Sequence, residues 1–264
     1  MGQEAVNIRA FNLPRHLRPI LFCIFLSMCS MNMASAQVTA DASLPESVRA
    51  IFQVVGTQVY SVVTEMFHGN PPLDLPIVIV LSSPPRTMLD DWAKPTSIRI
   101  GTTLTEPRLD QFVYQFSHEM GHVMLDPRRN SGFVDAICTA LSLAVLSRFN
   151  MGGYRKLNDT ESMQSLPLEI TSAVAAKDWT KVRSYLHDHR SEMEPDSPTY
   201  RPVQYLAALS ILSGPVDWGA LKGIAGCTEP GPNKDPSFRI LQIKPGCMTT
   251  VSDLDCRIGA NCQR

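Results

Sequence analysis

The sequence lacks the features that mark several protein classes: it has no long apolar run, no block of like charges and no surplus of basic residues. Its 264 residues include 24 Lys and Arg against 25 Asp and Glu, for a formal net charge of −1. Domains that bind nucleic acids usually carry a basic patch or stripe, so no nucleic-acid partner is expected. With 44% hydrophobic residues and no internal repeat, the composition is that of a globular protein and excludes disorder, collagen and coiled coil.

The N-terminus has the three parts of an export signal. Three arginines lie within the first 18 residues, an apolar run follows at residues 20–26, and a stretch of small residues ends at Ala36. This run is too short to cross a bilayer core about 30 Å thick. We therefore expect residues 1–36 to be a signal peptide cleaved after Ala36, leaving a secreted or periplasmic protein with no stable membrane anchor.

Cysteines crowd the C-terminal end of the chain, at Cys227, Cys247, Cys256 and Cys262. In an exported protein such a cluster is expected to form disulfides. Four cysteines can pair in three ways, and the sequence does not choose among them. We expect one domain over residues 37–225, followed by an irregular, disulfide-stapled tail over residues 226–264.

Hydrophobic periodicity predicts an α+β protein with a small N-terminal sheet and a mostly helical C-terminal half. Apolar residues recur at helical spacing in six segments: residues 45–68, 109–124, 132–149, 166–176, 179–187 and 200–212. Two segments have the composition of strands, residues 77–81 and 97–101, and the stretch between them, which contains Trp92, is expected to be a loop.

The helix expected at residues 109–124 contains the pattern His118-Glu119-x-x-His122. Residues four apart on a helix lie on one face, so both imidazoles can reach a single metal ion. Glu119 would then lie beside that ion and hold a water molecule without being a ligand. The pattern therefore predicts a metal site with a neighbouring general base.

A catalytic zinc site needs a third protein ligand and one open position. Asp135 is the best candidate, because it falls just inside the start of the next helix, on the side opposite Phe133 and Ile137. An acid in the first turn of a helix is also favoured by the helix dipole, which leaves a purely structural role as the alternative. Cys138 is expected to be a buried thiol that faces away from the metal.

The order of a strand, a helix with His-Glu-x-x-His, a short loop and a second helix resembles the gluzincin branch of the zincin metallopeptidases. Residues 116–124 are similar to the active-site helix of that family, and residues 132–135 resemble its second segment, commonly Trp-Phe-x-Glu. Two positions differ, since Gly132 replaces the Trp and Asp135 replaces the Glu. The resemblance extends over about residues 98–149.

The resemblance implies a zincin-like fold and an exported enzyme that hydrolyses peptide bonds in a peptide or protein substrate. It implies one Zn²⁺ ion held by His118, His122 and Asp135, with Glu119 as the general base. Such enzymes usually add a Tyr, His or Arg that stabilises the oxyanion. The sequence leaves four candidates open for that role: Tyr154, His187, His189 and Tyr200.

Two other functions remain open at this point. The aspartate at position 135 and the missing Trp are compatible with a zincin-like scaffold that binds a metal or a protein without catalysis. Alternatively, the chain is a disulfide-stapled helical binding protein in which the histidine pair is accidental. The last hypothesis predicts no bound metal and tolerance of His118→Ala.

Overall fold

A computed structural model describes residues 38–128, 132–189, 192 and 200–227. The chain divides into two units, Met1–Ala36 and Gln37–Arg264, and every described residue belongs to the second unit. The expected signal peptide and residues 228–264 of the expected tail therefore lie outside the described residues. Among the helices described, none is both long enough and apolar enough to cross a membrane.

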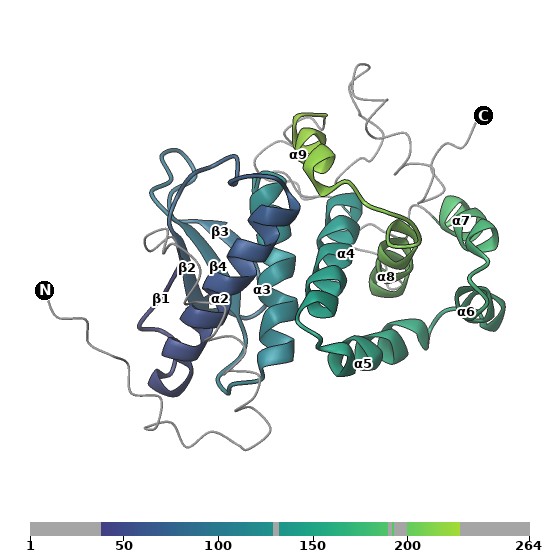
Figure 1. Cartoon of the computed structure of the whole chain (residues 1–264), viewed down its shortest axis with the longest axis horizontal. Coiled ribbons are helices and arrows are strands. Elements are labelled where there is room, and N and C mark those ends of the chain that lie inside the picture. The colour runs from purple at the N-terminus through teal and green to yellow at the C-terminus, as the bar shows by residue number, and fades with distance from the viewer. Residues whose placement is uncertain (1–37, 129–131, 190–191, 193–199, 228–264) are drawn as a thin grey trace, which may run out of the picture. The chain divides into compact units, whose positions relative to one another are not determined.

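A four-stranded mixed sheet occupies the N-terminal part of the described chain (Figure 1). Its strands are β1 (Val38–Ala40), β2 (Ile77–Leu81), β3 (Thr87–Leu89) and β4 (Ile98–Thr102), in the order β1-β2-β4-β3. The first three in this order are parallel, and β3 pairs antiparallel with β4 at the edge. The predictions of β2 and β4 are confirmed. The segment between them was expected to be a loop throughout, which is wrong for β3, because three residues are too few to show an alternating pattern.

Eight helices are described, and six of them confirm the segments predicted from helical periodicity. They are α2 (Glu46–Met66), α3 (Leu109–Met124), α4 (Gly132–Arg148), α5 (Gly152–Met163), α6 (Leu168–Ala175), α7 (Trp179–Asp188), α8 (Tyr200–Ile211) and α9 (Trp218–Cys227). Two of them, α5 and α9, were not predicted, because α5 opens with paired glycines and is largely polar, whereas α9 contains three glycines. Helix α9 also includes residues 226 and 227, the first two of the expected tail.

Helices α2 and α3 pack against the sheet and against each other, and α4 lies between α3 and α8 (Figure 1). The aromatic rings of Phe52 on α2 and Phe112 on α3 stack with centroids 4.1 Å apart, and both residues are fully buried. The α+β class with a small sheet and mostly helical content is confirmed. What matters for the site is the α3–α4 contact, where the sheet-containing part of the chain meets the helical part.

Candidate metal centre

The two histidines lie on the side of α3 that faces α4. The apolar stripe of α3, which includes Val113, Phe116 and Met120, is fully buried. His118 and His122 lie off this stripe, with side chains that are 20% and 10% exposed. Neither the hydrophobic core nor bulk solvent therefore surrounds them, as the sequence pattern indicated.

A glycine allows α4 to come close to this face of α3. A Cβ atom at position 121 would lie 2.7 Å from Sγ and 3.1 Å from Cα of Cys138, so a larger residue than Gly121 has no room. This close approach brings the first turn of α4 over the histidines. It compensates for the short side chain of Asp135, which reaches less far than a glutamate.

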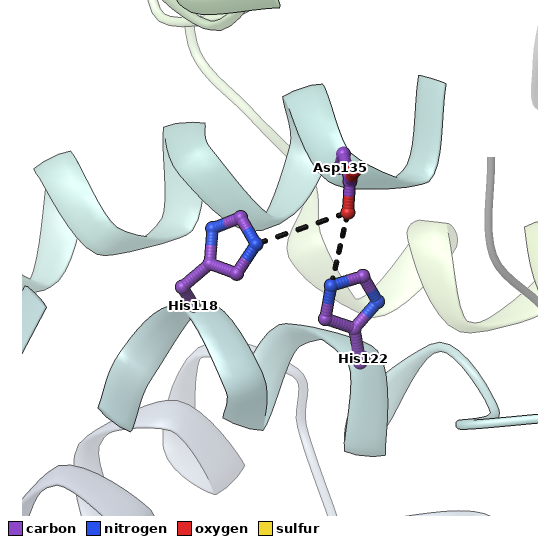
Figure 2. A group of neighbouring side chains, drawn as sticks. All are labelled: His118, His122 and Asp135. Carbon is purple, nitrogen blue, oxygen red and sulfur yellow. Dashed lines mark ion pairs between the residues drawn. The ribbon is translucent and has the colours of Figure 1, made fainter. Parts of the chain in front are cut away.

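The structure places His118, His122 and Asp135 together (Figure 2). Oδ1 of Asp135 lies 3.8 Å from Nε2 of His118 and 3.0 Å from Nε2 of His122. Ligand atoms bound tetrahedrally at about 2.0–2.2 Å from a zinc ion lie about 3.3–3.6 Å from one another. The two distances fall on either side of this range, and all three ligand atoms lie within 4.8 Å of one another, so the group could hold a metal ion.

The ionised carboxylate of Asp135 suits metal binding, whereas His122, whose pKa is raised, has to lose its proton before it can bind a metal. Burial raises the pKa of Asp135, but hydrogen bonds with His118 and His122 outweigh burial and hold the pKa well below its usual value. Burial in turn lowers the pKa of His122, but the interactions with Cys138 and Asp135 outweigh it and raise the pKa. Asp135 is therefore a carboxylate at neutral pH, the form in which it can bind a metal.

Asp135 and His118 each have a second side-chain partner. The Tyr200 hydroxyl donates a hydrogen bond to Oδ2 of Asp135, the oxygen opposite the one that faces the histidines. Oγ1 of Thr139 lies 3.5 Å from Nδ1 of His118. Residues behind metal ligands commonly fix ring orientation and tune metal affinity, so these contacts belong to the site.

The expectation for Cys138 was correct in part. Its thiol is fully buried and free, and burial raises its pKa. However, the thiol does not face away from the site, because its interaction with His122 raises the pKa of that histidine. The reason is the close α3–α4 packing at Gly121, which sequence spacing along α4 does not show.

Glu119 lies on the same helix but outside the ligand group. It is 5% exposed. Its Oε2 accepts a hydrogen bond of 2.8 Å from Oγ1 of Thr87, a residue of the edge strand β3. The geometry thus separates the three candidate ligands from a neighbouring carboxylate that is held by a different element.

The candidate ligands and Glu119 line one cavity of about 870 Å³. Of the four oxyanion candidates, Tyr154 and Tyr200 line this cavity, whereas His187 lies on α7, His189 directly follows that helix, and neither is among the lining residues. Burial raises the pKa of Tyr154 to about 12, so its hydroxyl remains a donor at neutral pH. The Tyr200 hydroxyl is engaged with Asp135.

Sequence reasoning missed several residues of the cavity wall, namely Arg86, Thr87, Tyr114 and Arg201. Arg86 and Thr87 lie in a segment that was expected to be a loop without a role. Arg201 directly follows Tyr200, and that proximity is the one signal that could have drawn attention to it.

No protein-family model, no curated protein and no solved structure matches this chain.

Proposed function

We propose that this protein is an exported zinc metallopeptidase with a zincin-like, gluzincin-type site. The observation that carries the proposal is that His118, His122, Asp135 and Glu119 line one cavity, with the ligand atoms of the first three within 4.8 Å of one another. The histidines and the aspartate would be the three protein ligands. The cavity would leave the fourth position of the ion open to water or substrate. Export rests on the composition of residues 1–36.

The residues of the chain have distinct roles in this proposal. Zinc bound by the three ligands would lower the pKa of a water molecule toward about 7 and polarise the scissile carbonyl. Glu119 would accept the proton that the attacking water loses and deliver it to the leaving amine nitrogen. Tyr154 has a hydroxyl in the same cavity and is the better placed of the oxyanion candidates, because the hydroxyl of Tyr200 is engaged with Asp135.

The first test is the zinc content of the purified protein, measured by elemental analysis after dialysis, for the wild type and for His122→Ala. We expect about one zinc ion per chain in the wild type and loss of most of it in the variant. A wild type that takes up no zinc even when zinc is supplied would contradict the proposal.

The second test is hydrolysis of a mixed-sequence fluorogenic peptide library by the zinc-loaded wild type and by Glu119→Gln. We expect cleavage by the wild type and a loss of about 10²–10⁴-fold in kcat for the variant, with zinc content unchanged, because the amide cannot accept the proton. Stoichiometric zinc without cleavage of any peptide would instead support the inactive scaffold.

A further inference from the structure

The short edge strand β3 contributes a side chain to the general base. Thr87 pairs with Ile100 of β4, which fixes its position at the edge of the sheet. From there its Oγ1 lies 2.8 Å from Oε2 of Glu119 and 3.0 Å from the main-chain oxygen of the same residue. A strand that sequence periodicity did not reveal is thus in direct contact with the residue proposed to carry protons.

The Thr87 hydroxyl has a single proton and two acceptors within reach. A hydrogen bond to a charged acceptor is stronger than one to a neutral carbonyl. The hydroxyl therefore donates mainly to the Glu119 carboxylate rather than to the main-chain oxygen. In the described part of the chain, no other side chain donates a hydrogen bond to that carboxylate. Its second oxygen, Oε1, therefore stays available to a water molecule in the cavity.

An anchor of this kind matters because a glutamate side chain has several rotatable bonds. Catalytic groups have to be held within about 0.5 Å of the productive geometry by packing and hydrogen bonds from neighbouring residues. Helix α3 fixes the main chain of Glu119 but leaves the carboxylate to be positioned by its surroundings. Thr87 supplies that constraint from a separate element, the sheet.

We propose that Thr87 is a positioning residue for Glu119, an inference that rests on the proposed peptidase function. The hydroxyl selects one orientation of the carboxylate and leaves the metal ligands untouched. Loss of the hydroxyl should therefore impair turnover without impairing the binding of zinc or substrate.

The test compares Thr87→Val with Thr87→Ser, each in the zinc-loaded full-length protein. Valine has nearly the shape of threonine and a high propensity for strands, but it lacks the hydroxyl. Serine keeps the hydroxyl. Thr39→Val is the matched control, because Thr39 is also a partly buried strand residue but its hydroxyl contacts only the main chain, at Ile77. kcat and KM are measured on the library peptide that the wild type cleaves fastest.

For Thr87→Val we expect a loss of about 10- to 100-fold in kcat, part of the full contribution of a general base. KM should stay within about twofold, because uniform binding is unaffected. Zinc content should match the wild type, and Thr87→Ser and Thr39→Val should retain nearly wild-type kcat. A crystal structure of zinc-loaded Thr87→Val should show Glu119 in another rotamer above unchanged ligands.

Three results would overturn the inference. Thr87→Val could keep wild-type kcat, which would show that the anchor is not needed. Thr87→Ser could lose as much activity as Thr87→Val, or zinc could be lost together with kcat, and either would indicate a structural role. If the zinc-loaded wild type cleaves no peptide, the proposed function itself fails, and the role of Thr87 fails with it.

Discussion

Helices α3 and α4 form opposite sides of the candidate metal centre, and they differ in how they are built. Helix α3 buries one apolar stripe and presents His118 and Glu119 to the cavity. Helix α4 is buried on nearly all sides, and Asp135 is the one acidic residue in its first turn. The histidines and Glu119 therefore come from an amphipathic helix. The third candidate ligand, Asp135, comes from a helix whose position is set by packing.

This difference has a mechanical consequence. On α3 the spacing of the two histidines is fixed by the helix itself, because residues four apart always share a face. The distance from those histidines to Asp135 depends on how closely α4 approaches, and Gly121 permits that approach. Substitutions on the α4 side should therefore show how far metal binding depends on packing between helices.

The largest effect is expected for Asp135→Ala. This variant removes a proposed ligand, and even the loss of residues behind metal ligands lowers affinity by about 10- to 100-fold, so we expect zinc affinity to fall more than about 100-fold. Competition with a chromogenic chelator measures it. Glu161→Ala is the control, because Glu161 lines the same cavity outside the ligand group. Equal loss in both variants would contradict a specific role for Asp135.

A smaller effect is expected for Tyr200→Phe. The phenol of Tyr200 donates to Oδ2 of Asp135 and so holds the carboxylate with Oδ1 toward the histidines. Without this donor, zinc affinity should fall by about 10- to 100-fold, the range typical of residues behind metal ligands. Tyr154→Phe serves as the control, since Tyr154 lines the cavity without a described hydrogen bond to Asp135. If both variants bind zinc like the wild type, helix packing alone holds the aspartate.

The same comparison explains which parts of the molecule the sequence could predict. Helix α3 was predicted with its observed bounds, Leu109–Met124, because a regular apolar stripe ends at a helix-breaking Asp-Pro pair. The His118 and His122 pair follows from local spacing. Asp135 was predicted as the third ligand from its position at the start of a helix and from the resemblance to a family. In the structure it lies beside the two histidines.

Contacts between distant segments could not be predicted in this way. Thr87 reaches Glu119 across 32 positions of sequence, and Tyr200 reaches Asp135 across 65. The interaction of Cys138 with His122 likewise depends on the distance between two helices rather than on periodicity. A single sequence contains no record of such pairs, so they appear only once the chain is folded.

The smallest effect is expected for Gly121→Ala, on the stability of the fold. Alanine in a helix interior is favoured over glycine by about 1 kcal/mol, which would stabilise α3. Its Cβ, however, would lie 3.0 Å from Cβ and 3.1 Å from Cα of Cys138, atoms that no side-chain rotation can move away. Overpacking of this kind costs about 1–3 kcal/mol, so the free energy of unfolding, measured by urea titration, should fall by up to about 2 kcal/mol.

Gly153→Ala separates the two contributions to this result. Gly153 also lies in a helix, α5, and an added Cβ there would meet nothing within 4 Å. This control should therefore show only the gain in helix propensity and be as stable as the wild type or more so. Gly121→Ala should in addition weaken zinc binding, because α4 and Asp135 are pushed away from the histidines. A Gly121→Ala protein with unchanged stability and zinc affinity would show that α4 can shift freely, and that packing against α3 does not set the position of the aspartate.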